Sequence, residues 1–196
     1  MSAHRLSRPS RSGTPGRDGA WARRVAAAGV LALTLGACSV APAASPATSH
    51  DGYCTTADHN AVTVIIDYGD LGPAPTIGCA VDLPEGATGL DALVALHVAV
   101  TEVTRTPQFV CRINNYPALD QVVAIPGKPA YTEDCVATPP QAAYWTYWSA
   151  TEGGTWTYSL QGYALHEVTI GGFEGYSFAH NITPTNAAPT VPPRTP

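Results

Sequence analysis

An uncharged apolar run that ends at a cysteine divides this chain into a part to be removed and a part to be folded. The run extends from Val25 to Ala37, follows Arg23-Arg24, and ends in Leu35-Gly36-Ala37-Cys38, which matches a bacterial lipobox. It is too short to cross a bilayer, which takes about 20 apolar residues. We therefore predict a lipoprotein signal peptide over residues 1–37 and lipid attachment at Cys38. The alternative is an ordinary signal peptide, cleaved near an alanine, that leaves Cys38 as a free thiol.

Export would leave an acidic protein. Six of the ten basic residues precede Cys38, so four basic residues stand against fourteen carboxylates after cleavage, hence a net charge of −10. Such a surface argues against nucleic acid as a partner, and it offers no basic patch for anionic lipids. The lipid alone is then expected to hold a monomer at the outer face of the cytoplasmic membrane. Arg23-Arg24 leaves both Sec and twin-arginine export open.

Composition marks both ends of the exported part as unfolded segments. Residues 38–50 are mainly Ala, Pro, Ser and Thr with no aromatic residue, which predicts a disordered tether. Residues 183–196 contain five prolines and no periodic apolar face, which predicts a disordered Pro-rich tail. Residues 51–182 remain as a single domain that is long enough to bury a core.

Four cysteines lie within residues 51–182, an even number that favours disulfides in an exported domain. They are Cys54, Cys79, Cys111 and Cys135, and three pairings are formally possible. We favour Cys54–Cys79, which would tie the lead-in of one strand to the next strand, and Cys111–Cys135, which would close a proline-containing loop. A metal site is the alternative, but there is no CxxC motif or Cys/His cluster to support it.

Hydrophobic patterns predict mostly strands and one helix. Alternation in Ala61–Tyr68 and Thr76–Leu83 is typical of strands with one apolar face. Thr88, with Asp91 three residues later, predicts the amino end of a helix. Another strand is expected at Phe109–Ile113, before an Asn-Asn turn signal.

The densest aromatic cluster of the chain predicts a β-hairpin. Tyr144-Trp145-Thr146-Tyr147-Trp148 is followed by Glu152-Gly153-Gly154 and by Thr155-Trp156-Thr157-Tyr158. Side-chain alternation places Trp145 and Tyr147 on one face of the first strand and its other aromatic residues on the opposite face. One face can fill the core. The sequence leaves open whether the other face is also covered or forms a recognition surface.

These motifs together resemble a family of actinobacterial secreted proteins that combine YWxYW, GxWxYS and GxEGWxF segments. The matching residues are Tyr144 to Trp148, Trp156-Thr157-Tyr158-Ser159, and Gly172-Phe173-Glu174-Gly175-Tyr176-Ser177-Phe178, where Tyr176 replaces the tryptophan. The family in turn resembles the carboxy-terminal β-grasp domain of transcobalamin and intrinsic factor, which closes over one face of the corrinoid. The resemblance covers roughly Asn60 to Phe178. It implies a small α+β domain of β-grasp type, with a mixed or antiparallel sheet packed on one helix.

Motifs of the common enzyme classes are missing from the sequence. It contains no GxSxG, HExxH, GxGxxG or Walker loop, and the histidines after Cys38 form no spaced cluster. Asp67-Tyr68-Gly69-Asp70 could be read as a carboxylate pair or a calcium loop, but Asp and Gly at a strand end are more typical of a turn. We expect no catalysis, no cofactor and no metal.

The expected function is that of a lipid-anchored binding domain for a small molecule, with corrinoid-like compounds as one candidate class, or of an accessory component of an uptake system beside a membrane transporter. The residues expected to form the ligand surface offer aromatic faces and polar donors, and they are Tyr144, Tyr147, Trp148, Trp156, Tyr158 and Tyr176. The alternative is a structural or protein-interaction lipoprotein whose aromatic strands only build the core. Burial of these rings distinguishes the two.

Overall fold

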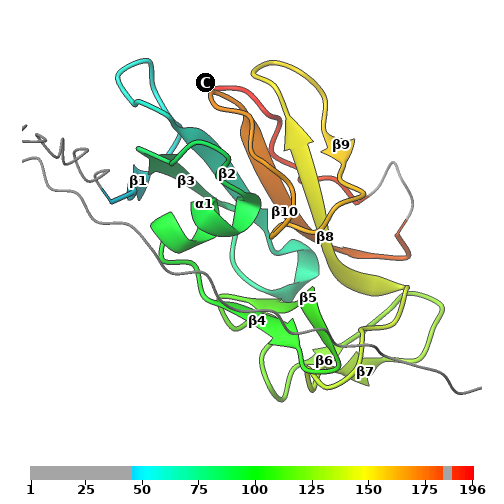
Figure 1. The fold of residues 1–196 in the computed structure, drawn as a ribbon. Coiled ribbons are helices and arrows are strands. Elements are labelled where there is room, and N and C mark those ends of the chain that lie inside the picture. Colours follow the sequence, from blue (N-terminus) through cyan, green and yellow to red (C-terminus); the bar gives the residue numbers. More distant parts are fainter. Residues whose placement is uncertain (1–45, 183–186) are drawn as a thin grey trace, which may run out of the picture. The chain divides into compact units, whose positions relative to one another are not determined.

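The fold is built on a mixed six-stranded sheet, seen in a computed structural model that describes residues 46–182 and 187–196. The strand order is β1 (Thr48–Asp51), β3 (Thr76–Val81), β2 (Val62–Asp67), β10 (Phe173–His180), β8 (Ala143–Ala150) and β9 (Thr157–Tyr158). The central strands β2 and β10 are parallel, and the other neighbours are antiparallel. Two small hairpins lie at one end of the sheet (Figure 1), namely β4 (Val100–Val103) with β5 (Thr106–Ile113) and β6 (Val122–Val123) with β7 (Tyr131–Thr132).

The one α-helix among the described residues, α1 (Gly89–Ala95), packs on one face of this sheet, which we call the helix face (Figure 1). Its start is the predicted one. The Thr88 hydroxyl accepts a hydrogen bond from the Asp91 amide, and the Asp91 carboxylate accepts one from the Thr88 amide at 2.8 Å, which together form a capping box. A short 3-10 turn, η1 (Gly69–Leu71), follows β2.

The helix face carries the main hydrophobic core. Alternating side chains of the three central strands point into it and are buried: Val62, Val64 and Ile66 of β2, Trp145 and Tyr147 of β8, and Tyr176 and Phe178 of β10. Leu93 of α1 covers them and is fully buried. The predicted strands within Ala61–Tyr68 and Thr76–Leu83 are therefore confirmed, as is the orientation of Trp145 and Tyr147.

Both favoured disulfides are present. Cys54 bonds to Cys79 with a Cα–Cα distance of 4.9 Å, and Cys111 bonds to Cys135 with a Cα–Cα distance of 5.5 Å. The first ties the lead-in of β2 to β3, and the second ties β5 to the loop that follows β7. The domain is thus mostly β, with a mixed sheet, one short helix and two disulfides.

The predicted end of the disordered tether, at residue 50, lies too far along the chain. Instead of remaining unpaired up to residue 50, the segment Thr48–Asp51 forms strand β1 and pairs antiparallel with β3. All four of its side chains are exposed, so burial of apolar surface does not hold it. Backbone pairing with β3 and a hydrogen bond of 2.8 Å from the Ser49 hydroxyl to the Ala95 carbonyl hold it instead.

The tail expected to be disordered over residues 183–196 is, from residue 187 onward, packed on the sheet. We call residues 187–196 the strap. Ala187, Pro189 and Pro193 are buried, and Thr190 hydrogen-bonds to Asp67 in β2. Composition failed to predict this because the strap forms no strand or helix of its own. It is ordered by covering the sheet face opposite α1.

The signal peptide and Cys38 lie outside the described residues. Within residues 46–182 and 187–196, no helix has the length and apolarity needed to span a membrane.

Candidate functional site

The six aromatic residues expected to bind a ligand lie in three different places. Tyr144, Tyr147 and Tyr158 line one groove. Tyr147 also stacks on Tyr176 in the core, with ring centroids 5.0 Å apart, and Tyr176 is almost fully buried. Trp148 and Trp156 belong to the face opposite α1, where Trp148 is buried and Trp156 contacts the strap.

The groove, which we call the tyrosine groove, opens between β5, β8 and the loop after β9. Its volume is about 260 Å³, and its wall combines aromatic, apolar and uncharged polar residues: Gln108, Phe109, Val110, Tyr144, Trp145, Tyr147, Tyr158, Ser159, Leu160, Gln161, Gly162 and Tyr163. The Phe109 and Tyr144 rings meet across it with centroids 5.9 Å apart. Leu160 is 95% exposed and Tyr158 is 38% exposed, so the outer part of the groove is open to solvent.

Local hydrogen bonds fix the loop that forms one wall of the tyrosine groove. The Ser159 amide donates to the Tyr147 carbonyl at 2.9 Å, which extends the pairing of β9 with β8 by one residue. The Tyr163 hydroxyl donates to the Glu102 carboxylate at 2.6 Å and ties the loop to β4. The Tyr158 ring packs edge-on against Trp148, with centroids 5.1 Å apart.

The hydroxyl groups of Tyr158 and Tyr163 in the groove stay protonated at neutral pH. Burial and the neighbouring Tyr144 hydroxyl raise the pKa of Tyr158 to about 12. Burial, together with the Glu102 carboxylate, also raises the pKa of Tyr163. Both phenols are therefore neutral and can donate as well as accept a hydrogen bond. No residue that lines the groove carries a charge.

Sequence reasoning identified the tyrosines of the groove but missed its other wall. Phe109, Leu160 and Tyr163 come from β5 and from a turn-rich loop, and they have no periodic relation to the aromatic hairpin. One local signal of this wall was Leu160, because it is an apolar residue between the polar Ser159 and Gln161.

The sequence also did not reveal the role of Glu174. It points into the core from β10, is 1% exposed, and accepts a hydrogen bond from the Tyr147 hydroxyl. Burial raises the pKa of its carboxyl group to about 8. Its position two residues before Tyr176, on the same side of the strand, was the available signal. The carboxyl group is sealed under α1, so we assign it to the core and not to a ligand site.

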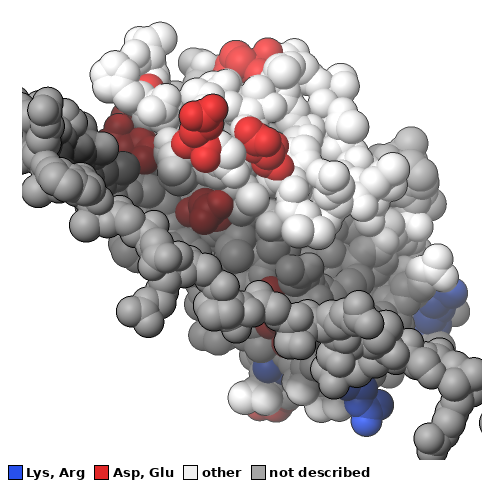
Figure 2. All heavy atoms as spheres, in the orientation of Figure 1, with Lys and Arg blue, Asp and Glu red and all other residues white. Residues whose placement is uncertain are grey.

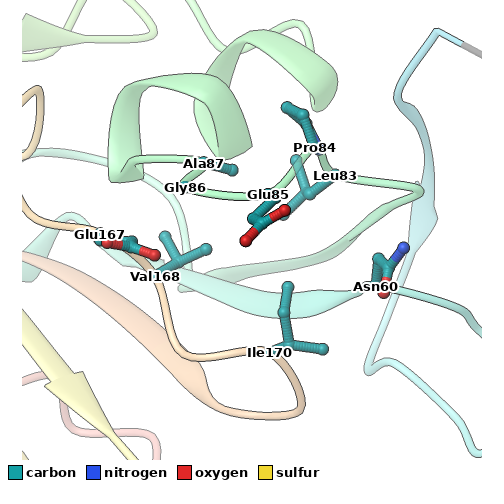
Figure 3. A pocket seen from close by; sticks show the side chains of 9 residues that line it. All are labelled: Asn60, Leu83, Pro84, Glu85, Gly86, Ala87, Glu167, Val168 and Ile170. Atoms are coloured by element: carbon teal, nitrogen blue, oxygen red, sulfur yellow. The ribbon is translucent and has the colours of Figure 1, made fainter. Parts of the chain in front are cut away.

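A separate hollow lies between the loop before α1 and the loop before β10 (Figure 3). It has a volume of about 380 Å³ and is lined by Asn60, Leu83, Pro84, Glu85, Gly86, Ala87, Glu167, Val168 and Ile170. Figure 3 shows the Glu85 and Glu167 side chains near its apolar wall, with Val168 between them in this view. Both glutamates are exposed. Most of the acidic side chains visible in Figure 2 lie in the upper part of the view, whereas the visible Lys and Arg side chains lie in the lower part, with a few acidic ones beside them.

Two groups of residues bring potential metal ligands close together, within the ranges that the structure describes. One is His50 with Asp58 and Cys79, and the other is Cys111 with Glu133 and Cys135. Every cysteine in these groups is in a disulfide, so its sulfur is not available as a thiolate. Arg112 also donates to the Glu133 carbonyl beside the second group. The donor sets therefore do not fit a metal ion.

Comparison with known proteins finds no relative: the chain matches no family model, no curated protein and no solved structure.

Proposed function

We propose that this chain is an exported, lipid-anchored domain of β-grasp type that binds a small molecule in the tyrosine groove. The observation that carries the proposal is the clustering of Tyr144, Tyr147 and Tyr158, three of the six residues expected from sequence, in one solvent-accessible groove with an exposed apolar rim. Resemblance to the small domain of transcobalamin supports the fold type, and the mixed sheet packed on one helix is consistent with it.

The chemistry of the groove favours a compact, mostly apolar ligand with one or two polar groups. Phe109 and Tyr144 supply aromatic faces, and Leu160 supplies an aliphatic edge. The protonated Tyr158 hydroxyl can orient a polar group of the ligand. At about 260 Å³ the groove is slightly smaller than the 300–1,000 Å³ of most ligand pockets. It would therefore hold a small ring system, or the edge of a larger one such as a corrinoid, without enclosing it.

Binding without catalysis is the better supported alternative for this groove. General acid–base or nucleophilic chemistry requires a titratable group tuned near neutral pH or a nucleophile beside a base. The lining residues include no His, Cys, Lys, Asp or Glu. Burial raises the pKa of the Tyr158 hydroxyl to about 12, which is far from neutral pH. The groove offers positioning and desolvation only.

A structural or protein-interaction lipoprotein is the second candidate, and burial of the other aromatic rings favours it. Trp148 and Tyr176 are 2% and 1% exposed, so they serve packing. Tyr147 contributes to both the core and the floor of the groove. In this alternative the tyrosine groove is an incidental hollow at the edge of β8.

The site would operate close to the membrane. If Cys38 carries the lipid, about ten residues separate it from β1, which reach at most ~36 Å when fully extended. That range fits an accessory role beside a membrane transporter better than long-range capture. The acidic exported part makes the acyl chains the expected attachment.

Ligand binding can be tested with the exported chain carrying Cys38→Ser, which removes the lipid. Tryptophan emission is recorded during titration with anilinonaphthalene sulfonate, cobinamide and a panel of small aromatic metabolites, since Trp145 lines the groove. Leu160→Ala should weaken binding of any compound in the groove by about tenfold. Leu119→Ala is the matched control, because Leu119 is also exposed, at 77%, but lies outside the groove. Equal affinity in both variants, or no response to any compound, would leave the structural alternative as the better explanation.

A further inference from the structure

The strap covers the face of the sheet opposite α1 (Figure 1). Several groups of the domain hydrogen-bond to its backbone carbonyls. The Trp156 indole donates to the Val191 carbonyl at 2.9 Å, and the Thr146 hydroxyl donates to the Ala187 carbonyl at 3.0 Å. The Gly153 amide donates to the Pro193 carbonyl at 2.8 Å. Side-chain and backbone donors of the domain thus hydrogen-bond to carbonyls along the strap, although the strap does not pair as a strand.

Asp67 makes the most specific contact to the strap. Its Oδ2 atom accepts hydrogen bonds from both the amide and the hydroxyl of Thr190, at 2.7 and 2.6 Å. The same carboxylate accepts a hydrogen bond from the Gly69 amide through Oδ1, at 3.0 Å, which fixes its orientation. Asp67 is 4% exposed when the strap is in place. The Thr190 amide and hydroxyl thus supply the two donors from the strap to this buried carboxylate.

The surface under the strap is shaped for proline. Gly175 of β10 lies below Pro189, and a Cβ atom at Gly175 would be 2.8 Å from Pro189 Cγ and 2.8 Å from Trp156 Cζ3. The Trp156 ring stands beside Phe173, with centroids 6.5 Å apart, and forms one side of the channel. Aromatic side chains that flank a proline and an indole N–H that binds a carbonyl are the means by which proline-rich segments are recognised.

The sheet face under the strap mixes polar and apolar side chains. The helix face is built mainly from Val, Ile, Leu and aromatic residues. The opposite face carries four buried polar side chains, Thr63, Asp67, Thr146 and Ser177, beside the buried apolar Ile65, Trp148 and Phe173. Burying polar groups costs free energy unless they are hydrogen-bonded. The strap supplies two donors to Asp67, and the Thr146 hydroxyl lies 2.8 Å from the Ser177 carbonyl and 3.0 Å from the Ala187 carbonyl. The face thus offers an extended segment both polar partners and aromatic side chains.

We propose that this face is a binding groove for extended proline-rich segments, occupied in cis by the strap, and that a partner protein carrying a Pro-Thr-Val-Pro-Pro-like segment binds by replacing it. Release of the strap breaks no strand ladder, since residues 187–196 belong to none. This binding face is separate from the tyrosine groove and does not depend on the small-molecule proposal. Because the strap belongs to the same chain, it acts at a high effective concentration and keeps weak competitors out.

The test weakens binding of the strap to its own domain by mutation and adds the same segment as a separate peptide. A dye-labelled peptide with the sequence of residues 187–196 is titrated into the full chain, into a Thr190→Val variant and into a Thr190→Ser variant, with fluorescence anisotropy as the readout. Thr190→Val removes the hydroxyl donor to Asp67 at nearly constant shape, and the variant should bind the peptide about tenfold more tightly than the wild-type chain. Thr190→Ser keeps the donor and should behave like wild type. A peptide that itself carries Thr190→Val should bind each of the three chains about tenfold more weakly than the unaltered peptide.

Absence of peptide binding to a Thr190→Val chain that melts at the wild-type temperature would overturn the proposal, as would binding that ignores the substitution in the peptide. Formation of dimers by this variant in sedimentation would show exchange of straps between copies and contradict the partner assignment. Hydrogen exchange on the wild-type chain gives a check that needs no mutation. The Thr190 amide should exchange about a hundredfold faster than the Ile65 amide of the central strand β2. Equal protection would mean that the strap leaves only on global unfolding.

Discussion

The hydroxyl of Tyr147 donates a hydrogen bond to the carboxyl group of Glu174, from one strand to its neighbour, inside the hydrophobic core. Tyr176 completes this buried arrangement, because its ring stacks on Tyr147 and its hydroxyl donates to the Gly89 carbonyl at the start of α1, at 3.1 Å. The carboxyl group is therefore held in its neutral form by burial. Charge on Glu174 would oppose the packing of α1 on the sheet.

Stability should fall as the pH rises because of Glu174. Burial raises the pKa of its carboxyl group from 4.5 to about 8 in the folded protein, so the unfolded chain releases this proton first. The folded state has its full advantage below about pH 4.5 and loses it progressively as the pH approaches 8. Urea unfolding at pH 5 and pH 9 should show a loss on the order of a few kcal/mol.

The variant Glu174→Gln should flatten this pH dependence, since it keeps the shape and removes the ionisable group. Glu152→Gln is the control, because Glu152 is exposed and its carboxylate accepts hydrogen bonds from Thr195. Unchanged pH dependence in Glu174→Gln would show that another group is responsible.

Gly175→Ala should detach the strap. The new methyl group would lie 2.8 Å from both Pro189 and Trp156, so either the strap or the indole must move, at a cost of about 1–3 kcal/mol. A lower melting temperature and a red shift of the tryptophan emission are expected together. Gly162→Ala is the matched control, because its nearest neighbour atom would be 3.8 Å away. Similar effects in both variants would indicate a general loss from replacing glycine, without a specific clash.

Each disulfide should contribute to stability through the loop that it closes. The sequence separations are 25 for Cys54–Cys79 and 24 for Cys111–Cys135, which correspond to about 3 kcal/mol each on the chain-entropy account. The paired substitutions to serine, one pair at a time, should lower the free energy of unfolding by that amount in non-reducing urea titrations. Reducing agent should lower the wild-type value and leave the double-pair variant unchanged. A wild-type chain that unfolds at the same urea concentration with and without reducing agent would contradict this.

Lipid attachment at Cys38 is a prediction from sequence with a direct readout. Mass spectrometry of the amino-terminal peptide should show a diacylated cysteine, and Cys38→Ser should move the protein from the membrane fraction to the medium. Cys54→Ser is the control, since it removes a different cysteine without touching the lipobox. An unmodified amino terminus in the wild-type protein would exclude the anchor.

Local patterns predicted the elements whose structure is decided locally. Alternation in Ala61–Tyr68 and the Thr88–Asp91 pair correctly predicted β2 and the start of α1, because strand faces and helix caps depend on neighbours in sequence. The cysteine pairing was predicted from the lead-in of one strand to the next for Cys54–Cys79 and from a proline-containing loop for Cys111–Cys135, and both bonds are present. By contrast, β1 and the strap take their order from distant partners. Thr190 contacts Asp67 across 123 positions, and no local pattern in an Ala, Pro and Thr segment could reveal such a contact.

The candidate site was predicted in part for the same reason. Aromatic alternation located the strands that carry Tyr144 and Tyr158, but it could not tell which rings α1 and the strap would cover. Tyr176 and Trp148 proved buried, one on each face of the sheet. The second wall of the tyrosine groove depends on how β5 approaches β8, which is a property of the tertiary fold.

If the predicted lipid at Cys38 holds the protein by its amino end, the Cys54–Cys79 disulfide has a mechanical consequence. A pull along the tether would reach β1 first, which lies at the edge of the sheet and buries none of its side chains. Peeling its four residues away would lengthen the tether by about 14 Å while the core stays closed. Further tension would act on the covalent bond between Cys54 and Cys79, which transmits the force to β3 and leaves β2 in place. The edge strand β1 would thus lengthen under force by a limited amount, which the disulfide sets.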